Sequence, residues 1–308
     1  MHKYILKRLA MMIPVILGVT VIIFLIMSLS PGDPARMALG DMAPPEALEA
    51  WRAEHGLNDY IVVRYFKYMA GLLHGDFGTS YLNGRSIAME IQSRFPITIR
   101  LAVIGMITAL VIAIPLGTIS AIKQYSVIDG FATVFGMLGI AMPSFWVALM
   151  MILIFSLRLG WLPSSGIEGW KSMILPALSI GFGCCANIMR TTRSSMLEVI
   201  RTDYIRTAKA KGVKKKDIIG RHAMRNVMIP VITVAGLQFG AMMGGAVIAE
   251  TVFSWPGIGT YMISSIKAKD TPAVMGSIIV FCVAFSVINL LVDLIYGLID
   301  PRIKSNYS

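Results

Sequence analysis

Apolar residues gather in long continuous runs along the chain, and polar stretches separate these runs. Six runs have about the length that an α-helix needs to cross a bilayer core of about 30 Å. Their apolar residues do not alternate with polar ones, which argues against a transmembrane β-barrel. Because backbone groups in lipid must pair within their own segment, we expect six transmembrane helices in an all-α polytopic membrane protein. The predicted spans are 9–29, 98–122, 131–157, 173–190, 228–250 and 275–299.

The polar stretch 31–97 predicts a small folded segment outside the membrane. Pro44-Pro45-Glu46 is typical of a helix start, and Gly56 of a helix end. A second helix is predicted from Tyr60 to Leu73, because its apolar residues recur at helical spacing. The segment either caps the spans or meets a substrate or a delivery protein. The chain thus divides into an anchor helix (1–30), an extracytoplasmic segment (31–97) and a five-helix transmembrane domain (98–300), which includes the loop 190–226.

Positive charge is concentrated in one loop, at 190–226. The 308-residue chain has a mean hydropathy of +0.71, only 15% charged residues and a net charge of +11. The loop holds 11 Lys and Arg residues against Glu198, Asp203 and Asp217, which gives it a net charge of +8. Lys and Arg mark cytoplasmic loops, so this loop and both termini are predicted to be cytoplasmic. The same bias accounts for most of the net charge, so we expect no nucleic-acid binding.

The basic loop predicts two short helices joined by a glycine turn. Apolar residues from Leu197 to Ala208 share one helical face, and Thr202 or Asp203 is a candidate cap for a shorter helix, 204–211. Gly212 follows where a helix would end. Residues 214–226 predict the second helix. Such a loop either docks on another protein or lies on anionic lipid.

The residues that catalysis, ATP binding or metal binding would need are missing. The sequence contains no GxxxxGK[ST] phosphate loop, HExxH or CxxC motif. The four histidines lie outside the spans without metal-ligand spacing, and the three cysteines (Cys184, Cys185, Cys282) lie in predicted spans, where packing is the simplest role. We therefore expect neither an enzyme nor a bound metal or cofactor.

Two acidic residues fall in or at the ends of the predicted spans. Glu250 ends the fifth span, and Asp293 lies near the cytoplasmic end of the sixth. Acids inside a membrane are candidates for function by default. The predicted role of Asp293 is an ion pair with Arg190 or Arg193, and proton-coupled transport is the alternative.

Several short motifs occur in an order that points to a known family. In these motifs the chain resembles the B-type inner-membrane permeases of the dipeptide, oligopeptide and nickel branch of ABC importers. The resemblance covers nearly the whole chain and implies the type I ABC importer permease fold. The matching stretches are Pro31-Gly32-Asp33-Pro34, Gly75-Asp76-Phe77-Gly78-Thr79-Ser80, Pro143-Ser144-Phe145-Trp146, Leu162-Pro163-Ser164-Ser165-Gly166, the stretch from Asp203 to Gly212, Phe253-Ser254-Trp255-Pro256-Gly257-Ile258-Gly259 and Asp300-Pro301-Arg302.

The resemblance implies that residues 203–212 form the coupling helix that enters a groove of a separate ATPase subunit. Arg206 stands where the general signature of this loop has Glu. In this departure the chain is similar to the peptide branch of the family. The implied ATPase-coupling residues are Asp203, Tyr204, Ile205, Arg206, Thr207, Ala208, Lys211 and Gly212.

The resemblance also implies a function and partners. The expected function is import of di- or oligopeptides across a bacterial or archaeal cytoplasmic membrane, with ATP used by the partner subunits. Implied partners are a second, homologous permease in a heterodimer, one or two ABC ATPase subunits and an extracytoplasmic binding protein. A nickel-chelate or glutathione importer of the same family is the nearest alternative, and a self-contained secondary transporter or channel is the alternative from another class. The sequence leaves the substrate-binding residues unassigned.

Overall fold

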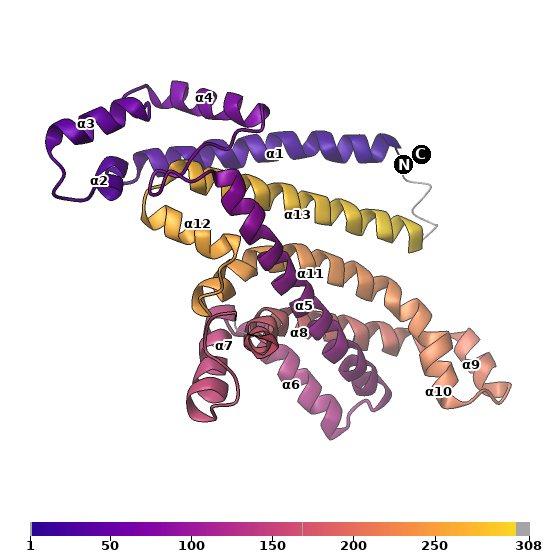
Figure 1. The fold of residues 1–308 in the computed structure, drawn as a ribbon. Helices are drawn as coiled ribbons and strands as arrows, with labels where there is room; N and C mark the ends of the chain where they lie inside the picture. The colour runs from indigo at the N-terminus through magenta and orange to yellow at the C-terminus, as the bar shows by residue number, and fades with distance from the viewer. Residues whose placement is uncertain (1, 168, 300–308) are drawn as a thin grey trace. The chain divides into compact units, whose positions relative to one another are not determined.

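The computed structural model describes residues 2–167 and 169–299, and within them the fold is helical without a strand. The terminal Asp300-Pro301-Arg302 motif lies outside these residues. Figure 1 shows the helices. They are α1 (His2–Leu29), α2 (Pro34–Leu39), α3 (Pro45–Glu54), α4 (Ile61–Leu73), α5 (Ile87–Ile122), α6 (Val127–Ala141), α7 (Ser144–Met151), η1 (Ile152–Arg158), η2 (Trp170–Met173), α8 (Ile174–Val199), α9 (Asp203–Ala210), α10 (Lys215–Asp217), η3 (Ile218–Ala223), α11 (Met224–Val252), α12 (Ile258–Lys267) and α13 (Thr271–Ile299).

Five of the six predicted spans are single long apolar helices. They cover Arg8–Leu29, Ile87–Ile122, Trp170–Val199, Lys215–Val252 and Thr271–Leu294. Several of them extend well beyond the apolar run that predicted them. The helix of the second span, α5, begins at Ile87 rather than at 98, because the charged pair Glu90 and Arg94 lowers the hydropathy of its first turns without ending the helix. The predicted all-α, multi-span fold is therefore confirmed.

The third predicted span is broken. Helix α6 ends at Ala141, and α7 begins at Ser144 and continues as the π-helix η1, with a bend of 112° between the two arms. Pro143 sits at the bend with φ −61° and ψ 138°. Proline cannot donate the backbone hydrogen bond of a helix interior, and it biases the preceding residue toward extended backbone. The break thus follows from the Pro143-Ser144-Phe145-Trp146 motif.

The described chain forms two compact units. One contains His2–Thr98 with Pro256–Ser286, and the other contains Ile99–Trp255 with the chain from Val287 onward. The helices α5 and α13 each have residues in both units, because each crosses a boundary between them along the sequence.

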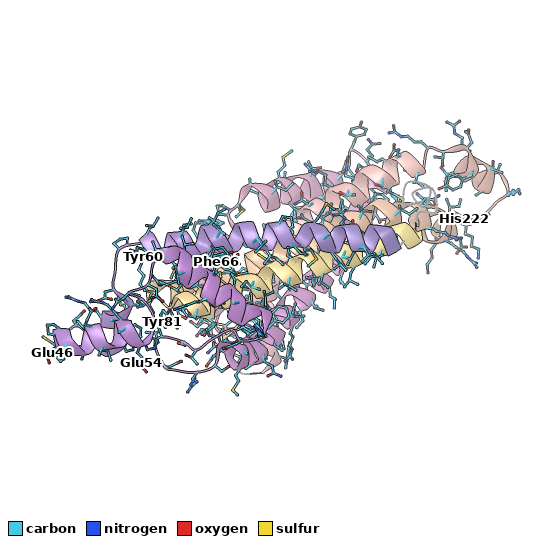
Figure 2. The ribbon with its side chains drawn as sticks, turned by 90° about the horizontal axis from the view of Figure 1, so that it is seen from above. Glu46, Glu54, Tyr60, Phe66, Tyr81 and His222 are labelled. Atoms are coloured by element: carbon cyan, nitrogen blue, oxygen red, sulfur yellow. The ribbon has the colours of Figure 1, made fainter. Side chains whose placement is uncertain are left out.

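In the first unit, the segment 31–97 has the two helices that the sequence predicts, α3 and α4, and a further helix, α2. Figures 1 and 2 show α4 beside α1, with Tyr60 and Phe66 labelled along α4 in Figure 2. The Tyr65 hydroxyl shares a hydrogen bond of 3.0 Å with Thr20, and the Tyr65 ring meets Phe24 edge to face at 5.4 Å. These contacts hold α4 on the anchor helix.

In the first unit, residues of two family motifs make hydrogen bonds and an ion pair between segments. Asp33 accepts a hydrogen bond from the Ala35 amide at the start of α2 and pairs with Arg52 of α3 at 2.6 Å. Ser80 donates to the carboxylate of Asp270, which is 1% exposed and also accepts from the Tyr81 amide. The motifs therefore mark the contacts that close the unit's loops.

In the second unit, glycines let the helices approach closely. A Cβ atom at Gly117 of α5 would lie 2.6 Å from the Met189 carbonyl oxygen of α8, and one at Gly139 of α6 would lie 2.6 Å from Ala186 of α8. Small residues at helix contacts are typical of helix packing in membranes. The helix α8 is the centre of this unit, since α6, α7 and α11 all pack against it.

Candidate functional site

The basic loop forms a short exposed helix that ends at a glycine. Helix α9 covers Asp203–Ala210, close to the predicted 204–211. Thr202 occupies the predicted cap position, but its hydroxyl donates to the Val199 carbonyl at 2.6 Å instead of accepting from the helix. Gly212 has φ +76°, the left-handed backbone that its position after a helix requires.

The predicted coupling residues lie on both faces of α9. Ile205 is fully buried and Ala208 is half-buried, while the outer face carries exposed side chains. The Tyr204 hydroxyl accepts a hydrogen bond from the Asn226 amide at 2.6 Å, which ties α9 to the first turn of α11. The exposed members of the predicted set are Asp203, Tyr204, Arg206, Thr207, Lys211 and Gly212.

Two expectations for this loop are wrong. No single apolar helix face runs from Leu197 to Ala208, because α8 continues to Val199 and α9 starts only at Asp203. The second loop helix is not a separate one either. Helix α10, the π-helix η3 and α11 run on without a break, so that Lys215–Val252 is one 38-residue helical segment. The loop therefore consists of one short helix, α9, that connects the end of α8 to the start of the segment Lys215–Val252.

An apolar cavity of about 410 Å³ lies under α9. Its floor is formed by isoleucines at the ends of α5 and α8 and in η3, with Lys209 and Lys215 also in the lining. Ile205 reaches into this lining from α9. The inner face of α9 therefore rests on apolar side chains that are not fully packed.

A buried ion pair fastens the base of the loop. Arg193 of α8 donates from Nε and Nη2 to the two carboxylate oxygens of Asp129 in α6, at 2.7 and 2.9 Å. Asp129, 5% exposed, also accepts from the Ser120 hydroxyl and the Tyr125 amide. Asp129 is not among the predicted residues, although Ser126-x-x-Asp129 is a recognisable helix-start pattern.

The ion pair replaces the predicted one between Arg193 and Asp293. Arg193 donates from Nε and Nη2 to Asp129, and its Nε also donates to the Ser120 hydroxyl at 3.0 Å. The pairing of Asp293 with Arg190 stays a prediction. Glu250 at the end of α11 is 0% exposed, so its side chain belongs to the protein interior.

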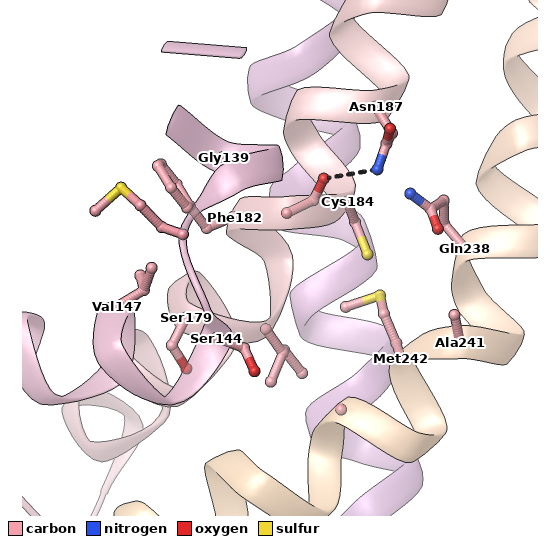
Figure 3. A pocket seen from close by; sticks show the side chains of 14 residues that line it. Gly139, Ser144, Val147, Ser179, Phe182, Cys184, Asn187, Gln238, Ala241 and Met242 are labelled. Atoms are coloured by element: carbon pink, nitrogen blue, oxygen red, sulfur yellow. Dashed lines mark hydrogen bonds between the residues drawn. The ribbon is translucent and has the colours of Figure 1, made fainter. Parts of the chain in front are cut away.

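A second cavity, of about 200 Å³, lies in the middle of the second unit where α6, α7, α8 and α11 meet (Figure 3). The 112° bend after α6 forms one wall of it. The side chains lining it carry no charge. The polar ones come from Ser144, Ser179, Cys184, Asn187 and Gln238.

Helices that are long and apolar enough to span a membrane, with an uncharged cavity between them, are typical of a multi-pass membrane transport protein. The described residues contain no cluster of three or more His, Cys, Asp or Glu side chains that could hold a metal ion. The family described as binding-protein-dependent transport system inner membrane component matches residues 113–305, and the model of its N-terminal part matches residues 1–102. The chain belongs to this family, the inner-membrane permeases of ABC importers.

Curated relatives are similar over almost the whole chain. The dipeptide transport system permease protein DppB of Alkalihalophilus pseudofirmus is 42% identical, over 99% of this chain and 100% of that protein. The glutathione transport system permease protein GsiC is 39% identical in Salmonella typhimurium and 38% in Escherichia coli K12, over 99% of both chains in each case. The predicted family is therefore confirmed.

The family also defines the setting in which the chain works. It is a family of transport permeases rather than enzymes, located in the inner membrane, and it works with an ATPase and a substrate-binding protein.

Proposed function

We propose that this chain carries di- or oligopeptides into the cell as one permease of a heterodimer, powered by ATP that separate ATPase subunits hydrolyse. The observation that carries the proposal is the similarity of the whole chain to permeases named for a dipeptide and for glutathione, itself a peptide. The uncharged cavity supports it, because neutral polar groups suit a peptide backbone better than a metal ion.

The coupling contact is α9 together with Gly212. Its outer face offers exposed polar and basic side chains to a groove on the ATPase, while Ile205 anchors it from within. The Tyr204–Asn226 hydrogen bond and the short connection from Val199 join α9 to α11 and α8. A displacement of α9 by the ATPase is therefore passed to two spanning helices, which switch the path between inward and outward access.

The proposal also includes the orientation of the chain in the membrane and its partner subunits. The basic loop and both termini face the cytoplasm of a bacterial or archaeal cell, by the distribution of Lys and Arg. The segment 31–97 lies outside and seats the binding protein, while residues 98–300 form the permease domain. One or two ATPase subunits complete the complex.

The coupling hypothesis is tested with Gly212→Pro in the complete complex. Proline cannot adopt φ +76°, and it removes the amide that donates to the Lys209 carbonyl at 3.0 Å. We expect assembly to persist and ATP-dependent uptake to fall at least about tenfold. Gly160→Pro is the matched control, since Gly160 has φ +64° and an amide that donates to the Ser156 carbonyl, but it lies in the loop after η1 and not beside α9. Equal uptake by both variants would contradict the coupling role.

The substrate is tested on the binding protein that works with this chain. We expect it to bind di- or oligopeptides, and the reconstituted complex to take them up only with ATP. Tight binding of a nickel chelate without peptide binding would overturn the peptide assignment. Flux in vesicles that contain this chain alone would instead indicate a self-contained transporter.

A further inference from the structure

The 200 Å³ cavity presents two side-chain amides from facing helices. Figure 3 shows Asn187 on α8 and Gln238 on α11 directed toward one another across it. Between the residues drawn, the one hydrogen bond runs from Asn187 Nδ2 to the Gly183 carbonyl, at 3.3 Å. Within the described residues, that bond uses one N–H of the Asn187 amide and leaves its second N–H and its oxygen without a recorded hydrogen-bond partner.

The chemistry of the lining selects for an uncharged polar group. None of the residues around the cavity is acidic or basic. A charged group placed here would lose its hydration without gaining a partner, which is costly. A peptide bond has one donor and one acceptor and no net charge. A side-chain amide matches it, because it can donate to the peptide carbonyl and accept from the peptide N–H.

The size and the walls of the cavity suit a short stretch of chain with uncharged side chains of different shapes. Its volume of about 200 Å³ lies below the range of about 300–1,000 Å³ that is usual for sites enclosing drug-sized ligands. It can therefore hold a peptide unit and its neighbouring side chains rather than a whole oligopeptide. Met142 and Met242 line it, and flexible thioethers adapt to side chains of different shape.

We propose that Asn187 and Gln238 form a subsite that hydrogen-bonds the backbone of a peptide during its passage through the membrane. This inference rests on the proposed peptide-transport function and adds the residues that contact the substrate. Because the two amides recognise the backbone, the subsite does not discriminate between uncharged side chains. It binds weakly enough for release, as a transport path requires.

The first test compares amide-free variants in the complete complex, reconstituted with its ATPases and binding protein. Asn187→Leu and Gln238→Leu each remove the hydrogen bonds and keep a similar volume. A net hydrogen bond changes an equilibrium by about three- to tenfold. We expect peptide uptake per ATP hydrolysed to fall by about that factor in each variant, while ATP hydrolysis stimulated by the binding protein stays within about twofold.

Matched controls lie on the same two helices. Thr191 and Thr233 bond their hydroxyls to carbonyls of their own helices, at 3.0 Å each, and neither lines the cavity. Thr191→Val and Thr233→Val should keep wild-type uptake per ATP. Wild-type uptake by both leucine variants would overturn the subsite and leave the peptide function standing. A wild-type complex that takes up no peptide would overturn the function itself.

A second measurement does not depend on the fold of the leucine variants. Ala241 lines the cavity, whereas its neighbour on α11, Leu237, is 58% exposed and outside the lining. In a chain whose three cysteines are replaced by alanine, Ala241→Cys and Leu237→Cys are labelled with a small thiol reagent during ATP turnover. We expect transported peptide to slow labelling at 241 by at least about threefold and to leave 237 unchanged. Equal labelling with and without peptide at 241 would overturn the proposal.

Discussion

Removing one partner of the buried pair between Arg193 and Asp129 should destabilise the chain strongly. The carboxylate accepts four hydrogen bonds, two of them from the guanidinium, and it is 5% exposed. Asp129→Ala leaves the Arg193 cation without this anion inside the protein. Breaking a buried pair from one side costs about 3–5 kcal/mol. The Arg193 side chain is 30% exposed, so we expect the lower end, about 3 kcal/mol.

The reverse substitution, Arg193→Leu, should cost a similar amount, because Asp129 keeps only the Ser120 and Tyr125 bonds. The double variant leaves no unpaired charge at this position. Its cost should therefore be well below the sum, with an interaction energy of about 2 kcal/mol in the double-mutant cycle.

The assay is reversible unfolding of the purified chain in mixed micelles, with the free energy of unfolding measured for the four members of the cycle. Lys67→Ala serves as the control. Lys67 pairs with Asp59 at 2.6 Å, but its side chain is 69% exposed, so its loss should cost less than about 1 kcal/mol. Additive costs for the two buried-pair variants, or single costs no larger than that of the control, would refute the reasoning.

Two further predictions concern helix packing and acid stability. Gly117→Ala should lower the free energy of unfolding by about 1–3 kcal/mol, since its Cβ meets the Met189 carbonyl, whereas Gly130→Ala, with open space around it, should be neutral or raise it by about 0.5–1 kcal/mol. Equal effects at the two glycines would contradict the packing of α5 on α8. Arg52 lowers the pKa of Asp33 below its ordinary value of 3.8. The ionised pair therefore stabilises α2 and α3 above about pH 4, and this stabilisation is lost as the pH falls through the lowered pKa. Hydrogen exchange of α3, corrected for intrinsic rates, should show this acid-dependent step, and Asp33→Asn should remove it. An unchanged step in that variant would assign it to another group.

The spans and the exposed loop helix could be predicted because one local pattern determines each. Runs of apolar residues identified five helices, and Gly212 identified the end of α9. Helix α12 was missed, because ten residues with mixed polarity resemble a loop when read alone. It is fixed in the structure by contacts distant in sequence, including the bond from the Ile258 amide to the Thr98 hydroxyl at 3.0 Å.

The candidate site depends more on distant contacts than on local pattern. Asn187 and Gln238 lie 51 positions apart by residue number, and only the packing of α8 on α11 makes them neighbours of one cavity. An uncharged amide in an apolar run also gives a weak signal, since it changes neither charge nor helix periodicity. The same holds for Asp129, whose partner in α8 follows it by 64 positions.

The uninterrupted segment from Lys215 to Val252 makes the junction between the basic loop and the membrane mechanically stiff. Gln238 lies 23 residues beyond Lys215, or about 35 Å at 1.5 Å per residue. A flexible linker would absorb a push at its end, but a helix turns it into a tilt along its length. Pro230 lies between the two points, and the helix continues through it without a break. A force on the loop is therefore expected to tilt this helix and to move the wall of the cavity that the helix forms.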